Sequence, residues 1–77
     1  MVNKNNQITS LQMQATMMFQ ANRLHEAGEL NYRICQLDPN NADAWHNVGY
    51  VCLQMNDLQG AEGAARKSIS ISPSGSR

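Results

Sequence analysis

Charge, aromatic residues and long apolar runs are all scarce in this 77-residue sequence. Six Lys and Arg balance six Asp and Glu, so the formal net charge is zero, and a neutral chain has no general attraction for nucleic acid or an anionic membrane. No apolar run approaches the roughly 20 residues that span a bilayer, and the first seven residues lack the hydrophobic segment of a signal peptide. These absences predict a cytoplasmic protein that binds neither nucleic acid nor a membrane.

The sequence also lacks the residue spacing of a metal or catalytic centre. Its two cysteines, Cys35 and Cys52, are interpreted as small buried hydrophobes, with a disulfide or a reactive thiol as the alternative. His25, Glu26 and Glu29 are close enough in sequence to share a helix face, but a third and fourth metal ligand are missing. Neither a nucleophile–base arrangement nor a glycine-rich phosphate loop is recognisable. We therefore expect no enzyme activity, no metal and no cofactor.

What the sequence does contain is one internal repeat with a period of 34 residues. Five pairs of identical residues stand at this spacing: Gln20 and Gln54, Asn22 and Asn56, Leu24 and Leu58, Ala27 and Ala61, and Pro39 and Pro73. A period of this length is typical of a unit that cannot bury its apolar face alone and stacks on a copy of itself. The repeat favours a binding surface over a reaction centre.

Helical spacing and breaker residues predict four helices, with breaks near residues 22–23, 38–41 and 56–57. Thr9 or Ser10 is the expected N-cap of the first helix. Asn22 is expected to end that helix in the left-handed conformation, and Asn56 to end the third. Pro39 stops the second helix, Asn41 is suited to cap the third, and Pro73 ends the fourth. The fold class is all-α, with two stacked helix-turn-helix units at 8–41 and 42–75, a disordered tail at 1–7 and a short tail at 76–77.

The spacing within each unit resembles the tetratricopeptide repeat. Trp45, Val48, Gly49 and Cys52, then Ala61 and Pro73, follow the order in which that family places Trp, Leu, Gly, Tyr, Ala and Pro. Leu11, Ala15, Met18, Ala27 and Pro39 match the same positions more loosely in the first unit. Asn31 and Ala65 depart from the family, because an aromatic residue is usual there. We expect Trp45 to fill the space between paired helices and to be largely buried.

In such arrays the first helix of each repeat lines a concave groove, which the resemblance identifies as the site of protein or peptide binding. The groove positions are then Thr9, Gln12, Thr16, Phe19, Gln20, Asp43, His46, Asn47, Tyr50, Leu53 and Gln54. Aromatic anchors with a polar rim are typical of recognition surfaces. No Lys or Arg stands at a groove position, so the carboxylate clamp that binds acidic chaperone C-termini is not expected.

Small residues in the last helix predict a second surface. The expected self-association face consists of Gly60, Ala61, Ala64, Ala65, Ser68 and Ile69. We expect this face to be open because no further helix follows Pro73, while Met13, Met17 and Ala21 give the first helix a soft apolar edge. A homodimer is the expected result, through the small-residue face or by helix exchange, and head-to-tail stacking would instead give open filaments.

Three interpretations of the function remain open on this evidence. The chain is a scaffold module that binds a peptide or partner protein, a self-assembling structural element, or a repeat fragment of a larger protein. The sequence of the junction at 37–45 looks like that of a bacterial protein. In bacterial proteins, such repeats often precede a glycosyltransferase or methyltransferase domain. That last interpretation rests on analogy between folds alone.

Overall fold

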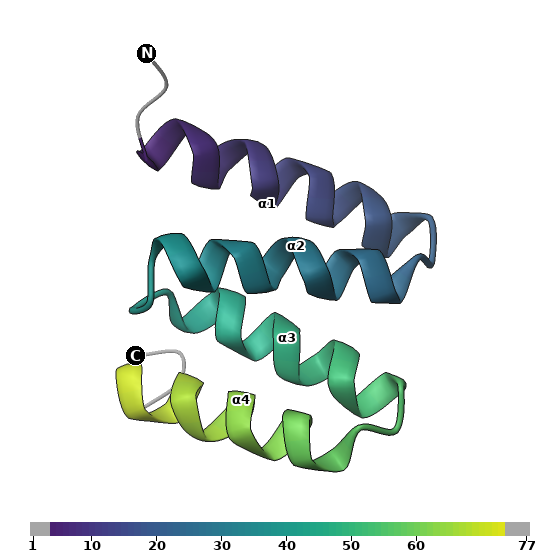
Figure 1. Ribbon diagram of the computed structural model, residues 1–77, viewed down its shortest axis with the longest axis vertical. Helices are drawn as coiled ribbons and strands as arrows, with labels where there is room; N and C mark the ends of the chain where they lie inside the picture. Colours follow the sequence, from purple (N-terminus) through teal and green to yellow (C-terminus); the bar gives the residue numbers. More distant parts are fainter. Residues whose placement is uncertain (1–3, 74–77) are drawn as a thin grey trace.

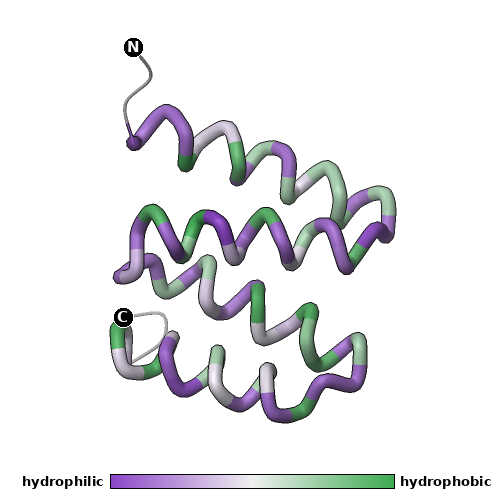
Figure 2. Tube along the Cα trace, in the orientation of Figure 1, coloured by the Kyte–Doolittle hydropathy of each residue, from purple (hydrophilic) through white to green (hydrophobic). Residues whose placement is uncertain are grey.

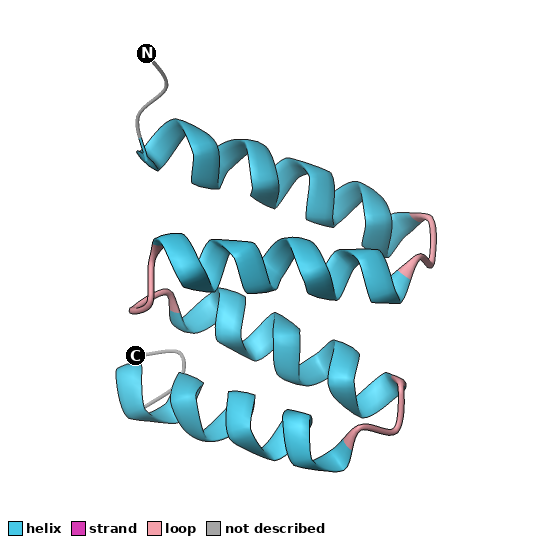
Figure 3. Ribbon diagram, in the orientation of Figure 1, coloured by secondary structure: helices cyan, strands magenta, loops and turns pink. Residues whose placement is uncertain are grey.

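The computed structural model describes residues 4–73 and consists of four α-helices that lie side by side in chain order. They are α1 (Lys4–Gln20), α2 (Leu24–Leu37), α3 (Ala42–Gln54) and α4 (Leu58–Ile71). Successive helices run antiparallel, so that α1 and α4 form the two ends of the row (Figure 1). Only helices and short loops occur among the described residues (Figure 3). The expected all-α fold of two helical hairpins is confirmed.

Asparagines close the first and third helices as the sequence predicts. Asn22 has φ 60° and Asn56 has φ 64°, the left-handed backbone that Asn tolerates better than most residues. The residue after each asparagine donates its N–H to the carbonyl five residues earlier, at 2.8 Å in both turns (Arg23 to Met18, Asp57 to Cys52). The two hairpins therefore turn by the same hydrogen-bond pattern, one period apart.

Side-chain caps begin the third and fourth helices. The Asn41 Oδ1 atom accepts a hydrogen bond from the Ala44 N–H at 3.0 Å, which confirms the expected cap. Asp57, which the sequence interpretation overlooked, accepts from the Gly60 N–H at 3.1 Å in the same way. The Asn41 carboxamide oxygen and the Asp57 carboxylate oxygen each accept a hydrogen bond from an N–H group in the first turn, which has no acceptor within the helix.

The first helix begins earlier than the sequence suggests. It starts at Lys4, so Thr9 and Ser10 lie inside it, and the expected disordered tail is wrong for residues 4–7. Residues 1–3, and the tail at 76–77, lie outside the described part. The helix extends because Ile8, one turn before Leu11, also packs against the core. An apolar residue at that spacing was the signal for the longer helix.

The core lies where α2 meets its two neighbours. Ile34, Cys35 and Ala44 are buried together, with half-buried side chains from α1 and α3 packed around them (Ile8, Leu11, Trp45 and Val48). Burial raises the pKa of the Cys35 thiol to about 11. The interpretation of Cys35 as a small buried hydrophobe is therefore confirmed, whereas Cys52 is only half-buried. Both thiols are free.

Trp45 is more exposed than expected, because it faces a surface hollow on one side. It is half-buried, and its indole Nε1 donates to the Pro39 carbonyl at 3.0 Å. Its ring meets Tyr32 edge-on at 6.3 Å, and the Lys67 ammonium lies 5.9 Å from the ring centroid. Trp45 thus contacts side chains of α2 and α4 from its place on α3 at the edge of the core, whereas a largely buried side chain was predicted.

Within residues 4–73, each helix packs most closely against its neighbours in the chain: α1 on α2, α2 on α3, and α3 on α4. Side chains of α1 and α3 also meet, at Phe19 and Tyr50. Hydrophobic and hydrophilic residues alternate along every helix (Figure 2), so no helix is apolar all round. None of the described helices is long and apolar enough to cross a bilayer. The single row creates two opposite faces, one presented by α1 and α3 and the other by α2 and α4.

Candidate functional site

A hollow of about 400 Å³ lies between α1 and α3 on the first of these faces. Its walls come from α1 and α3, and the nearly buried side chains of Asn31 and Ile34 of α2 form its floor. The lining residues are Gln12, Ala15, Thr16, Phe19, Asn31, Ile34, Asp43, Ala44, His46 and Asn47. Six of them, Gln12, Thr16, Phe19, Asp43, His46 and Asn47, were predicted as groove positions from the sequence. The structure therefore brings together residues that are about one repeat apart.

Asn31 makes the floor of this hollow polar. Its side chain is 3 % exposed, yet both of its polar atoms are bonded. The Nδ2 atom donates to the Ala27 carbonyl at 2.9 Å, and the Oδ1 atom accepts from the Asn47 Nδ2 atom at 3.2 Å. The second bond joins α2 to α3 and fixes the Asn47 carboxamide at the wall. The sequence interpretation missed this role, although a polar residue on the inner stripe of a helix was the available signal.

An aromatic pair continues the hollow toward the other end of α1 and α3. The Phe19 and Tyr50 rings are 6.0 Å apart and tilted by 58°, and Tyr50 remains 47 % exposed. Other predicted groove residues are also exposed but do not line the hollow: Thr9, Gln20, Leu53 and Gln54. The predicted groove thus has three parts: the residues that line the hollow, the Phe19–Tyr50 pair beside it, and four exposed residues that do not line it.

The enclosed part of the groove has a mildly acidic character. Asp43 is the single carboxylate among the lining residues, and none of them is Lys or Arg. His46, which is exposed, adds a group that acts as donor or acceptor. Together with three carboxamides and a threonine, these residues present many hydrogen-bonding groups around one aromatic ring. A surface of this composition suits a neutral or basic ligand and repels an acidic one.

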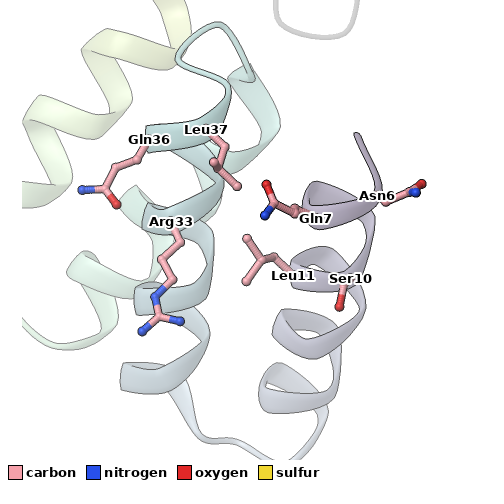
Figure 4. Close-up of a pocket in the computed structure, with 7 residues that line it drawn as sticks. All are labelled: Asn6, Gln7, Ser10, Leu11, Arg33, Gln36 and Leu37. Atoms are coloured by element: carbon pink, nitrogen blue, oxygen red, sulfur yellow. The ribbon is translucent and has the colours of Figure 1, made fainter. Parts of the chain in front are cut away.

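The opposite face carries a larger and more apolar hollow of about 710 Å³, between α2 and α4. Tyr32, Trp45, Val48, Val51 and Met55 supply most of its apolar wall. A third hollow, of about 520 Å³, lies between α1 and α2, where Leu11 points from α1 toward α2 and Arg33 and Gln36 stand on the far side (Figure 4). Neither of these two hollows contains a predicted groove residue.

The small residues of α4 do not form one open face, as the sequence suggested. Ala64 is buried, because it packs against Gly49 of α3, where an added Cβ would lie 3.4 Å from the Ala64 methyl group. Ala61 is half-buried at the same contact, Ser68 donates its hydroxyl to the Ala42 carbonyl at 3.1 Å, and Gly60 lines the α2–α4 hollow. The expectation that these six residues are open is therefore wrong for four of them, and only Ala65 and Ile69 of the six are exposed.

The titratable side chains form no further site within the described part of the chain. His25 lies 3.4 Å from Glu29 on the exposed face of α2, and no group of three or more His, Cys, Asp or Glu residues is arranged to hold a metal ion among residues 4–73. Burial raises the pKa of the Cys52 thiol, and the nearby Asp57 carboxylate raises it further. A raised pKa leaves less thiolate and makes a thiol less reactive.

Comparison with known proteins identifies the repeat. The family described as the tetratricopeptide repeat matches residues 32–63, which run from the second half of α2 through α3 into α4. No curated protein and no solved structure matches the chain. The matched segment contains Trp45, Gly49 and Ala61, three of the residues on which the resemblance was based. Residues 32–63 are therefore similar to the tetratricopeptide repeat, and the four described helices pack as helical hairpins, which is consistent with the all-α fold of that family.

Proposed function

We propose that the chain is a non-enzymatic protein-interaction module that binds a peptide segment along the α1–α3 face. The observation that supports this most directly is the hollow between α1 and α3, in which six predicted groove residues converge over a floor of Asn31 and Ile34. The family match supports the same class of function, because tetratricopeptide repeats are interaction motifs. The groove would recognise the partner by anchoring one side chain and hydrogen-bonding its backbone.

The Phe19 and Tyr50 pair is the proposed apolar anchor. Exposed aromatic rings beside polar groups are typical of residues that contribute most of the binding free energy at an interface. The carboxamides of Gln12 and Asn47 are available to bond a peptide backbone, and Asn47 is already held in place by Asn31. Asp43 favours a peptide with a basic group and disfavours an acidic one.

A displayed library of random peptides, selected against the intact chain, tests this function. We expect the selected peptides to lack acidic residues and to shift amide resonances of α1 and α3. Tyr50→Ala should raise the Kd of a selected peptide about tenfold, which corresponds to about 1.4 kcal/mol, without changing the far-UV circular dichroism. The dissociation constants are measured by isothermal titration calorimetry.

Tyr32→Ala is the matched control for this substitution. Tyr32 is 49 % exposed, close to the 47 % of Tyr50, but it lies in the α2–α4 hollow on the opposite face. We expect Tyr32→Ala to leave the Kd unchanged. A library that yields no binder contradicts the proposal, and so do peptides that lose affinity with Tyr32→Ala but keep it with Tyr50→Ala.

A further inference from the structure

The polar groups of the α1–α3 hollow have donors that are already in use and acceptors that are not. The Thr16 hydroxyl donates its hydrogen to the Gln12 carbonyl at 2.9 Å, so only its lone pairs remain for a ligand. The Asn47 Nδ2 atom donates to the Asn31 Oδ1 atom at 3.2 Å, whereas no described residue donates to the Asn47 Oδ1 atom. Both walls of the hollow therefore offer an oxygen that can accept a hydrogen bond.

A chain of hydrogen bonds that starts at the backbone fixes the direction of the Asn47 carboxamide. The Ala27 carbonyl can only accept, so the Asn31 atom that meets it at 2.9 Å is the Nδ2 donor. The Asn31 Oδ1 atom is then the one that faces Asn47, and it requires a donor there. Turning either carboxamide over would bring two donors or two acceptors together. Asn47 therefore uses an N–H at the floor and keeps its Oδ1 atom for a ligand.

The Asp43 carboxylate adds a negative charge to these acceptors. An ionised carboxylate can only accept hydrogen bonds, and no described residue donates to Asp43 or forms an ion pair with it, whereas Glu26 and Glu62 are each paired with an arginine. Asp43 and Asn47 are four residues apart on α3, so their side chains share one face of the helix. Because no Lys or Arg lines the hollow, its unused groups suit a cation that carries several donors.

The Phe19 ring distinguishes between the cations that proteins contain. It lines the same hollow from α1 and is half-buried. A guanidinium group is planar, weakly hydrated and able to stack on an aromatic face, whereas an ammonium group is compact and strongly hydrated. A guanidinium group also has five N–H donors in one plane and no acceptor. It therefore matches a hollow that combines an aromatic ring with acceptors on both walls.

We propose that the α1–α3 hollow binds the guanidinium group of an arginine side chain in the partner peptide. The Asp43 carboxylate supplies the opposite charge, Thr16 Oγ1 and Asn47 Oδ1 accept further N–H groups, and the Phe19 ring packs on the guanidinium plane. Asn31 is a positioning residue, because it acts through the Asn47 carboxamide. This specificity rests on the proposed peptide-binding function and names the residue that the peptide carries.

Nuclear magnetic resonance titration of the intact chain with N-acetyl-arginine N-methylamide tests this inference. The capped compound has the guanidinium group as its only charge, and the corresponding citrulline compound is a neutral analogue of nearly the same shape. We expect the arginine compound to shift amide resonances of α1 and α3, with a Kd about tenfold lower than that of the citrulline compound. The corresponding lysine compound should also bind more weakly than the arginine compound. The ionic strength is held constant throughout, because salt screens exposed charges.

Asp43→Asn removes the charge from the hollow with little change in shape. It should raise the Kd of the arginine compound about tenfold and leave that of the citrulline compound nearly unchanged, so that the preference disappears. Glu29→Gln is the matched control, because Glu29 is also an exposed carboxylate but lines the α2–α4 hollow on the opposite face. It should leave both Kd values unchanged. Thr16→Val, which keeps the shape and removes one acceptor, should raise the Kd of the arginine compound about threefold.

The comparison between compounds needs no variant, so the inference can fail even if a substitution unfolds the chain. Equal affinity of the parent for the arginine and citrulline compounds overturns it, as does a lysine compound that binds as tightly as arginine. Shifts confined to the α2–α4 face overturn it as well.

The proposed peptide function can fail separately from this specificity. Library peptides that bind α1 and α3, but keep their affinity when arginine is replaced by citrulline, support the peptide function and overturn the guanidinium site. If the arginine compound binds as expected and the library yields no binder, the guanidinium site is supported and the peptide function alone fails.

Discussion

Asn31 stands where this repeat family usually places an aromatic residue, and that exchange shapes the candidate groove. An aromatic side chain would fill the space under α1 and α3 with apolar atoms. Asn31 instead is a short polar group whose donor and acceptor are both bonded, inside the helix to Ala27 and across the junction to Asn47. A buried carboxamide is tolerated because both of its polar atoms find partners. The floor of the groove is polar for this reason.

Replacing Asn31 should therefore affect both stability and the groove. Asn31→Ala removes two hydrogen bonds at a buried site and should lower the free energy of unfolding by about 1–3 kcal/mol. Asn47→Ala leaves the buried Asn31 Oδ1 atom without its partner. In a double-mutant cycle measured by urea denaturation, the two substitutions should couple by about 0.5–1.5 kcal/mol. Strictly additive effects would mean that the Asn31–Asn47 bond contributes nothing to the folded state.

At the scale of single helices, replacing Gly63 or Gly28 by alanine should change the free energy of unfolding in opposite directions. Gly63 lies in the interior of α4, and a Cβ added there would meet no atom within 4 Å. Gly63→Ala should raise the free energy of unfolding by about 0.5–1 kcal/mol, because alanine loses less backbone entropy in a helix. The exposed glycine therefore weakens α4 without improving its packing.

Gly28 of α2 is the matched comparison for Gly63. A Cβ added at Gly28 would lie 2.8 Å from the Val51 Cγ1 atom of α3. Gly28→Ala should therefore force the two helices apart and lower the free energy of unfolding by about 1–3 kcal/mol. Urea denaturation of both variants measures the two changes. Equal effects would show that close approach at the α2–α3 junction does not matter.

The features predicted correctly from the sequence are those fixed by local chemistry. The left-handed Asn22 and Asn56, the Asn41 cap and the ends imposed by proline each depend on a few neighbouring residues, and the structure confirms them. The errors arose where a residue's environment depends on packing between helices. Ile8 extends α1 only because the end of α2 lies against it, and Ala64 is buried only because Gly49 lets α4 approach closely.

The candidate site was predicted in part for the same reason. The family resemblance, with which helical spacing agrees, placed Gln12, Thr16 and Phe19 on one side of the first helix and Asp43, His46 and Asn47 on one side of the third, and these six residues line the hollow. The distance between α1 and α3 depends on α2, which lies between them. It therefore cannot be predicted from the sequence of α1 or of α3 alone. The polar floor at Asn31 was therefore missed, and Leu53 and Gln54 were included although they do not line the hollow.

At the scale of the whole molecule, the single row of helices predicts an uneven distribution of stability. In a repeat array, stability is approximately the sum of each unit and its nearest-neighbour contacts. The inner helices α2 and α3 each have two neighbours, whereas α1 and α4 have one. The buried cluster of Ile34, Cys35 and Ala44 also lies in the inner helices. Local opening should therefore begin at the ends of the row.

Amide hydrogen exchange on the intact chain measures this gradient directly. In dilute solution, the amides of α2 and α3 should exchange most slowly, and those of α1 and α4 should exchange faster because their helices open without disrupting the inner contacts. Equal protection across all four helices would contradict the gradient and indicate one cooperative unit.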